Sequence, residues 1–541
     1  MTEQDHELQD LGWFRKLRSY VTIEPVIVFY IFGVVSSTGL KVFEYEKACA
    51  TKLDVDLAVC EFFPQLEDNN LCDDVATEEM TNSSSAQMLS AIANFTTASD
   101  PHFSKTVCSA KEKSINEVAF LNSYRSIITG LVQAVVLLFA GSWSDRVGLR
   151  KPCILIPIAA DVANFCVLIL CATFMREISL EVTGILPNLL TSLSGGTPLV
   201  VTGMYSYLTV CTSEKNRTFR FACAAVVIAT IPIGANFFSG FLFKSLGFVK
   251  LCLLCIVTDS IGLMYGFFIL KEPTEISDNS TVQEKESRSN QNGGTLNESW
   301  RKLFDFTLVI DCIQVLTRKR NFNLRLIVIL TVVVYFINYG SLGDAESAAI
   351  LAYLRFNWIT NLGTWISYDL ATTLLGTLLA MGVLSKRFGV SDFLICVFSV
   401  CFTLVGKPIM AYAVSAVKPH LYYVATSIDV FEGSKTVAIR SIVSKLVEQH
   451  EIGKMLAIIG IVDSMQVVIY PTLYSTVYLK TQDFFLGSVF LLSEAFLLVS
   501  LGFYITLYFL VKESNRRKAA EMTKQNEKEG IDNPAMEITS L

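Results

Sequence analysis

The sequence is poor in charged residues and in histidine. Charged side chains make up 17% of its 541 residues, against about 25% in an average soluble protein, and it has four histidines. It contains no H-E-x-x-H pair, no phosphate-binding glycine loop and no serine elbow, so we expect neither an enzyme nor a cofactor or metal site. The net charge of −6 is modest and gives no reason to expect a nucleic-acid partner.

Long apolar runs take the place of the missing charge. Runs of about 20 residues, the length that crosses a bilayer, form two groups of six that are separated by a polar gap. They lie near 23–43, 118–140, 152–174, 181–209, 221–242, 248–270, 324–342, 363–384, 390–413, 420–443, 454–478 and 486–511. We therefore expect an all-α membrane protein with twelve transmembrane helices in two six-helix halves, 23–270 and 324–511. The polar and basic segment 1–22 does not predict a cleavable signal peptide.

The fourth apolar run is interrupted by Ser194-Gly195-Gly196-Thr197-Pro198. Small residues allow two helices to approach closely in a membrane. Glycine and proline also mark places where a helix can bend or break. The interruption therefore predicts either a packing notch or a hinge.

Two short charged loops occupy corresponding places in the two halves. Gly141-Ser-Trp-Ser-Asp145-Arg146-Val-Gly148-Leu-Arg150-Lys151 joins the second and third runs. Gly382-Val-Leu-Ser-Lys386-Arg387-Phe-Gly389 repeats the glycine and arginine spacing, with a lysine in place of the aspartate. An ordinary basic cytoplasmic loop explains one such stretch, whereas two copies indicate an internal repeat.

This spacing resembles the loop signature of the major facilitator superfamily between its second and third helices. The resemblance implies the major facilitator fold and alternating access, in which two halves rock about a central site. We expect Asp145, Arg146 and Arg150 to hold the cytoplasmic helix ends together when the site faces outward. Glycine at 141 and 148 permits the tight turn, and Arg387 takes the corresponding place in the second copy.

The distribution of lysine and arginine predicts the orientation in the membrane. Basic clusters at 15–18, 146–151, 215–220, 318–325, 386–387 and 516–518 all fall on one side of a twelve-span arrangement. That side is therefore cytosolic, together with both termini, the linker 271–323 and the tail 512–541. The composition of the linker and of the charged tail predicts that both lack a fixed fold.

The loop 44–117 lies on the opposite side and differs in character. It is rich in acidic residues, has few lysines and contains no arginine. Two glycosylation sequons, at Asn82 and Asn94, and four cysteines predict an extracytosolic cap with disulfides. The cysteines are Cys49, Cys60, Cys72 and Cys108, and four cysteines allow three pairings.

Three further motifs resemble the proton-coupled folate transporter and heme carrier family of solute carriers. They are Glu24-Pro25, Asn216-Arg-Thr-Phe-Arg220 and Arg440-Ser-Ile-Val-Ser-Lys-Leu-Val-Glu-Gln-His-Glu-Ile-Gly453. The resemblance implies transport of an organic anion or metabolite of the folate, heme or muropeptide type, at the plasma or lysosomal membrane. Ala225 and Leu193 stand where the folate carrier has acidic residues, which argues against folate itself.

Charged residues inside apolar runs are expensive to bury and usually mark a transport pathway. The carboxylates of this kind are Asp161, Asp259, Asp369, Asp429, Glu432, Asp463 and Glu494. Near the end of a run a carboxylate simply touches water, which is an alternative for Asp369 and Glu494.

In the tenth run, Asp429, Glu432 and Arg440 share one face of a continuous helix, and Lys435 lies one turn from Glu432. This face suits a cavity that binds an anion. Arg440 by itself can instead reach the cytosolic surface.

The histidines of the folate carrier have no counterpart here, so proton coupling would rest on these carboxylates. A proton on a buried carboxylate cancels a costly charge and links protonation to a conformational change. We therefore predict a proton symporter of a small organic solute. The alternative is a receptor or scaffold that keeps a transporter fold without flux. The C-terminal Thr539-Ser540-Leu541 matches a short ligand for PDZ domains.

Overall fold

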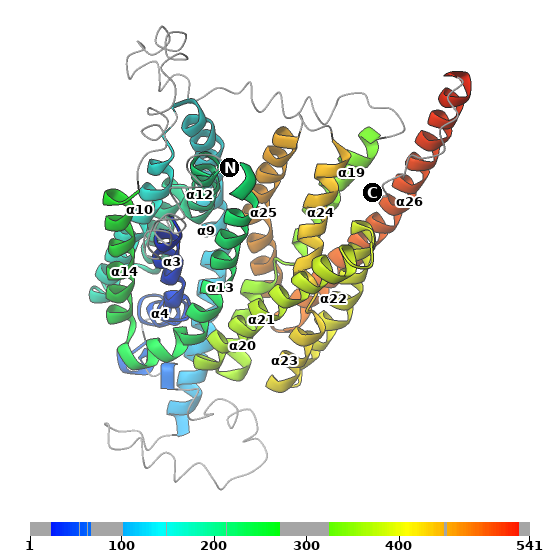
Figure 1. Ribbon diagram of the computed structural model, residues 1–541. Coiled ribbons are helices and arrows are strands. Elements are labelled where there is room, and N and C mark those ends of the chain that lie inside the picture. The colour runs from blue at the N-terminus through cyan, green and yellow to red at the C-terminus, as the bar shows by residue number, and fades with distance from the viewer. Residues whose placement is uncertain are drawn as a thin grey trace. The chain divides into compact units, whose positions relative to one another are not determined.

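The computed structural model describes residues 23–53, 55–61, 63–65, 101–147, 149–212, 214–270, 324–447 and 452–529. These residues form helices and no strand (Figure 1). Several predicted features lie outside the described residues: Gly148, Cys72, Asn82, Asn94, the N-terminal segment, the linker and the C-terminal PDZ motif.

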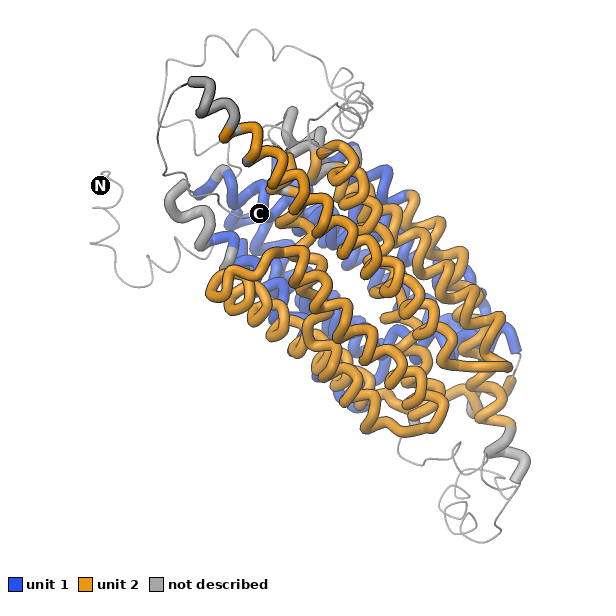
Figure 2. The backbone as a smooth tube through the Cα atoms, turned by 90° about the vertical axis from the view of Figure 1, so that its right-hand side faces the viewer, with its two compact units in different colours: residues 1–54, 132–304 blue, residues 55–131, 305–541 orange. Residues whose placement is uncertain are grey.

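Contacts divide the chain into two units, which Figure 2 shows in different colours. The first unit comprises 1–54 and 132–304 and contains the N-terminal spans. Its helices are α3 (Glu24–Phe32), η1 (Gly33–Ser36), α4 (Ser37–Thr51), the end of α9 (Pro101–Val147), α10 (Lys151–Thr173), α11 (Leu180–Leu193), α12 (Gly196–Cys211), α13 (Glu214–Leu246) and α14 (Phe248–Phe268).

The second unit comprises 55–131 and 305–541, so it includes the beginning of α9 besides the C-terminal spans. Two short elements, α5 (Leu57–Cys60) and η2 (Phe63–Gln65), precede α9. The others are α19 (Leu324–Gly340), α20 (Ala345–Phe356), α21 (Thr360–Leu379), the π-helical η4 (Ala380–Ser385), α22 (Asp392–Ser415), α23 (Pro419–Ile428), α24 (Glu432–Leu446), α25 (Ile452–Thr481) and α26 (Ser488–Glu529).

The same packing pattern recurs within the two units. In the first, α10 packs against α11, α12 and α14, and α14 packs against α3. In the second, α22 packs against α23, α24 and α26, and α26 packs against α19. Each unit has its own apolar core, formed around Ile27 and Ile158 in the first and around Ile439 and Leu497 in the second. Such a repeat is typical of transporters built from two related halves.

The fourth and tenth predicted spans do not form helices that are long enough to cross a membrane on their own. Ten helices in the described part of the chain are long and apolar enough to cross a membrane. The fourth span is divided into α11 and α12, of 14 and 16 residues, and the tenth into α23 and α24, of 10 and 15 residues. A break at membrane depth is tolerated only where protein buries it or water reaches it. The fourth helix of both halves is therefore interrupted.

The first two spans extend beyond their predicted ends. Helix α4 continues to Thr51, and α9 already begins at Pro101, so the predicted loop 44–117 is helical at both ends. Lys47 is fully buried, and its ammonium donates to the carbonyls of Cys171 at 2.8 Å and Phe174 at 3.0 Å. These carbonyls lie at the C-terminal end of α10, where a cation is favoured. Lys47, which lies in the predicted loop, therefore joins α4 to α10.

The predicted disorder of the tail is wrong for its first part, because α26 continues to Glu529. This stretch is rich in glutamate, lysine and alanine, which favour a helix even without an apolar face. Arg517 and Glu513, one turn apart, form an ion pair at 3.0 Å.

We predict that Gly376→Ala destabilises the protein, because a Cβ at this position of α21 would collide with the carbonyl oxygen of Val430 in the break of span ten. Overpacking of this kind costs about 1–3 kcal/mol. The matched control is Gly382→Ala, since a Cβ at 382 meets no heavy atom within 4 Å. Thermal unfolding of the purified variants in detergent measures the difference. Equal melting temperatures for the two variants would contradict this packing.

Candidate functional site

The break in span ten lies at Asp429-Val430-Phe431, between α23 and α24. The carbonyl oxygen of Phe431 accepts hydrogen bonds from the hydroxyls of Ser399 at 2.7 Å and Ser434 at 2.6 Å. Phe431 immediately precedes α24 and its carbonyl also accepts from the backbone N–H of Ser434 at 3.0 Å, so these hydroxyls are additional donors at the start of α24. The predicted common face of Asp429, Glu432 and Arg440 assumed one continuous helix, so the break removes that geometry.

Span seven is also broken, between Gly340 at the end of α19 and Ala345 at the start of α20. The hydroxyl of Tyr474 donates to the carbonyl of Gly340 at 2.6 Å. The turn carries Ser341 and Asp344, whose side chains are both buried. The two breaks of the second unit thus supply buried polar side chains to the interior of the same unit.

Five charged side chains from these breaks and from α22 form a buried charge cluster: Asp344, Lys407, Asp429, Glu432 and Lys435. The ammonium of Lys407 lies 3.0 Å from Asp344, 3.6 Å from Glu432 and 3.9 Å from Asp429. Lys435 lies 3.7 Å from Glu432 and donates to the hydroxyl of Ser341 at 3.0 Å. Every one of the five side chains is at most 12% exposed.

The carboxylates of the cluster are not equally well held. Asp344 accepts from Lys407 and from the hydroxyl of Ser493 at 2.9 Å. Glu432 lies near both ammonium groups. Asp429 has an ion-pair contact with Lys407 alone, at 3.9 Å, the longest such distance in the cluster, and its other oxygen accepts from the hydroxyl of Thr403 at 2.5 Å. Asp429 therefore has the weakest compensation by positive charge.

The cluster contains three carboxylates but only two ammonium groups, so its ionised form carries a negative charge. Asp369 on α21 and Glu494 on α26 also interact electrostatically with Lys407 and add to this imbalance. The sequence allowed the alternative that these two carboxylates simply contact water. In the structure, both interact electrostatically with Lys407 of the cluster. A buried excess of one charge sign is costly unless a proton or a counter-ion neutralises it.

Arg440 and Asp463 form a separate pair, farther along α24. The guanidinium lies 3.1 Å from Asp463 and 3.1 Å from the hydroxyl of Tyr335, which in turn donates to Asp463 at 2.5 Å. Arg440 is 51% exposed and Asp463 35% exposed. Eight residues of helix, about 12 Å, separate Arg440 from Glu432. The predicted pathway residues therefore lie at two separate sites. Glu432 belongs to the buried charge cluster, and Arg440 and Asp463 form the second site.

In the first unit, the break in span four rests on two glycines. Gly195 and Gly196 have φ angles of +88° and +55°, a region that favours glycine. The side chain of Gln133 donates to the carbonyl of Gly195 at 3.3 Å, and Thr197 is hydrogen-bonded to Tyr30 at 3.0 Å. The interruption predicted from the sequence is therefore a true break in the helix.

The basic residues after α9 fasten helices of the first unit to one another. Arg150 donates to the backbone carbonyl and, at 2.6 Å, to the hydroxyl of Ser206 on α12. Lys151 donates to the carbonyls of Phe267 at 2.6 Å and Leu270 at 2.8 Å, at the end of α14. These contacts anchor the start of α10.

The remaining residues of the two charged loops are placed only in part. Gly141, Asp145 and Arg146 lie within the last turns of α9, but the structure does not describe their side chains. Arg387 is exposed, in the turn that follows η4. The cytoplasmic latch between these loops stays a prediction.

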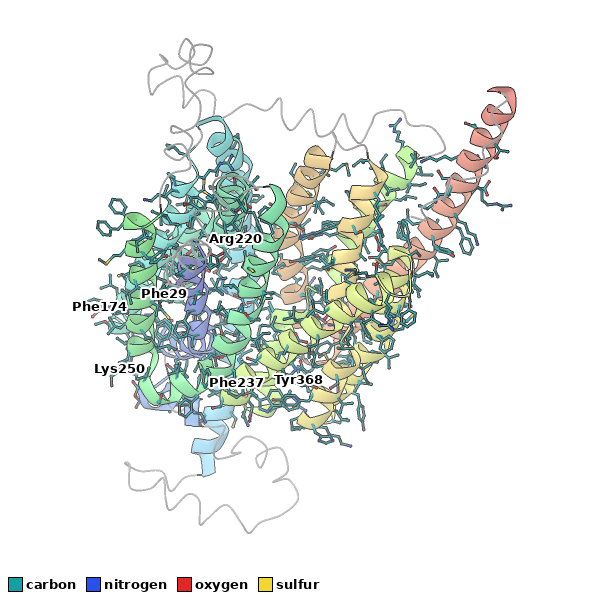
Figure 3. All side chains as sticks on the ribbon, viewed as in Figure 1. Phe29, Phe174, Arg220, Phe237, Lys250 and Tyr368 are labelled. Carbon is teal, nitrogen blue, oxygen red and sulfur yellow. The ribbon has the colours of Figure 1, made fainter. Side chains whose placement is uncertain are left out.

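Two of the family motifs meet in the first unit. Arg220 of α13, labelled in Figure 3, lies 3.2 Å from the carboxylate of Glu24, and both side chains are buried. The ion pair joins the start of α3 to α13. In the predicted loop 44–117, Cys49, Cys60 and Cys108 are disulfide-bonded.

Two members of the cluster, Lys407 and Asp344, were not identified from the sequence. Besides Asp392 near its start, Lys407 is the one charged residue of the ninth predicted run, 390–413, so the rule that buried charges mark function applies to it. The candidates predicted from the sequence were carboxylates and residues of the tenth run. Asp344 lies just beyond the predicted end of span seven at 342, where it suggested an ordinary loop.

The helical units, the repeated packing and the interrupted fourth helices define a multi-pass membrane protein with the major facilitator fold. Two solved structures share this fold. The human organic anion transporter MFSD10 has a TM-score of 0.51 at 13% identity and covers 90% of this chain and 98% of its own. A POT family transporter in complex with a thioalcohol-conjugated peptide has a TM-score of 0.53 at 11% identity and covers 90% and 96%.

Curated relatives narrow the resemblance, although no protein-family model matches the chain. The lysosomal proton-coupled steroid conjugate and bile acid symporter SLC46A3 of Homo sapiens is 23% identical over 393 residues, 72% of this chain and 79% of that protein. The proton-coupled folate transporter of Rattus norvegicus is 22% identical over 396 residues, 71% and 79%. The predicted resemblance to this solute carrier family is confirmed, and the relatives are transporters rather than enzymes.

We predict that Lys407→Met destabilises the protein strongly, because it leaves the buried carboxylates with one ammonium group. Breaking a buried ion pair from one side costs about 3–5 kcal/mol. A second substitution, Asp344→Asn, removes one of the stranded charges and should restore part of the loss. Thermal unfolding of the single and double variants measures both effects. Lys418→Met, at an exposed lysine beyond α22, is the control. If Lys407→Met melts with that control, the cluster does not stabilise the fold.

Proposed function

We propose that the chain is a proton-coupled symporter of small organic anions, and that the buried charge cluster couples the proton to the anion. The observation that carries the proposal is the excess of carboxylates over ammonium groups in this cluster. It lies at breaks in spans seven and ten, and interrupted helices in transporters provide substrate and ion sites.

Asp429 is the carboxylate that takes the proton. Its compensation by Lys407 is weaker than that of Asp344 or Glu432, and it lies within the helix break itself. With Asp429 protonated, two carboxylates face two ammonium groups and the cluster is neutral. An approaching anion then meets Lys407 and Lys435 with one negative charge fewer behind them. With Asp429 ionised, the same anion is repelled, so proton and anion bind together.

The substrate class follows from the two lysines and from the relatives. Lys435 is fully buried, and an anionic group of the substrate would compete with Glu432 for it. SLC46A3 carries steroid conjugates and bile acids according to its name, and MFSD10 is named an organic anion transporter. We propose an amphipathic organic anion of this kind, carried across a plasma or lysosomal membrane that has an acidic side.

Flux into proteoliposomes tests the function directly. The purified protein is offered a steroid conjugate, a bile acid, folate and a muropeptide at acidic and at neutral outside pH. The proposal expects accumulation that grows with the inward proton gradient and collapses when a protonophore is added. Flux that does not depend on pH would refute the symport. Absence of flux for every compound would favour a receptor or scaffold.

We predict that Asp429→Asn separates exchange from proton coupling. The amide has the shape of the protonated acid and is always neutral, so the variant binds the anion at any pH but no longer carries a proton at residue 429. Exchange of labelled for unlabelled substrate should persist, while accumulation driven by a proton gradient should fall well below that of the parent protein. Asp483→Asn, at an exposed aspartate after α25, should behave like the parent protein. Full proton-driven accumulation by Asp429→Asn would rule out Asp429 as the coupling group.

A further inference from the structure

Asp259 in the first unit is a fully buried carboxyl group without a hydrogen-bond partner. It lies on α14, its exposed fraction is 0%, and neither of its oxygens is hydrogen-bonded. An ionised carboxylate in such a place lacks both water and donors, which is among the most costly arrangements in a protein. The cluster in the second unit does not include it.

Asp161 on α10 lies close to Asp259 and interacts with it electrostatically. Both converge on η1, the irregular 3₁₀ segment of span one. A Cβ built at Gly33 would lie 3.8 Å from an oxygen of Asp161. Cys255, one turn before Asp259, lies 3.9 Å from the carbonyl of Gly33. Asn164 donates to Asp161 at 3.2 Å, so Asp161, unlike Asp259, has a donor.

The helices around the pair provide no cation to neutralise it. Helix α3 contacts α14 at Phe29, which Figure 3 labels. A Cβ built at Gly262 of α14 would lie 3.1 Å from the Cβ of Phe29. The titratable groups that interact with the pair or lie beside it are Tyr30 of α3 and Cys252 and Cys255 of α14. Two cations of α13 and α4 have other partners: Arg220 pairs with Glu24, and Lys47 donates to two carbonyls. In the described part of the chain, neither Asp161 nor Asp259 forms an ion pair.

The corresponding place in the second unit has the charge that is missing here. Spans one and seven are both irregular, at 33–36 and 341–344. Span nine, the counterpart of the span that carries Asp161, contributes Lys407 beside Asp344. Span twelve, the counterpart of the span that carries Asp259, contributes Ser493. Around the irregular span, the second unit thus has a lysine beside a carboxylate, whereas the first unit has two carboxylates.

We propose that Asp161 and Asp259 form a second proton site, in which the proton resides on Asp259 and passes through the partly exposed Asp161. A proton is the smallest charge that neutralises a buried carboxylate where no cation fits, and two neighbouring carboxylates cannot both ionise readily. The proposal that a proton occupies Asp259 in the resting protein depends on these contacts alone. That the site fills and empties during each cycle rests on the proposed function.

Infrared spectroscopy of the purified protein tests the occupancy without any substrate. A protonated carboxylic acid has a carbonyl band distinct from that of a carboxylate, and the band shifts in deuterated water. The proposal expects a band at neutral pH in the parent protein that Asp259→Asn removes and that the exposed control Asp483→Asn leaves in place. Should Asp259→Asn fail to fold, Asp161→Asn is measured instead and should narrow and shift the same band. A spectrum that Asp259→Asn does not change would overturn the site.

The ratio of protons to substrate tests the cycling. Asp259→Asn should lower the ratio by one proton relative to the parent and keep the coupling that depends on Asp429. Loss of the infrared band with an unchanged ratio would make Asp259 a structural acid and overturn the inference. If the parent protein has the band but its flux does not depend on pH, both the proposed function and the cycling of the proton at the second site are refuted. If the parent transports with protons but lacks the band, only the second site fails.

Discussion

A membrane offers no water to a free carbonyl or to an uncompensated charge, so each break in a helix must be satisfied from within the protein. In this chain the breaks are satisfied in two ways. Hydroxyls of Ser399, Ser434 and Tyr474 take up carbonyls at the interruptions of spans ten and seven. The charges that the same breaks bring inside are compensated by Lys407 and Lys435, but incompletely. The proposed proton would neutralise the negative charge that remains.

The repeat explains why charges of different sign occupy related places. Both units pack their third span on the fourth and the sixth, so a residue of the third span faces the irregular first span in each. That residue is Asp161 in the first unit and Lys407 in the second. A common framework can therefore hold a proton in one half and an anion-binding cation in the other, because the helix positions are shared while the side chains differ.

The sequence predicted the membrane class, the twelve runs and the interruption of span four, because hydrophobic length and glycine act locally. It also identified Asp429, Glu432 and Lys435 as charges that a membrane span does not bury without a partner. It could not predict the break at Val430, since no glycine or proline lies within it, Gly433 belongs to α24, and the close approach of Gly376 to Val430 is a tertiary contact. The same limit hid Asp344 and Lys407, whose importance comes from residues more than sixty positions away. The helical tail to Glu529 was missed because low hydrophobicity was taken as disorder.

The central claim is that transport is coupled to protons through a buried excess of carboxylates. The most direct test is the substrate gradient at which net flux stops in proteoliposomes that have a fixed pH difference and no membrane potential. The account predicts that flux stops only when substrate has accumulated on the side that protons enter, and that the balance point moves with the pH difference. If net flux stops at equal substrate concentrations for every pH difference, the protein is a facilitator and the charge imbalance has no role in transport.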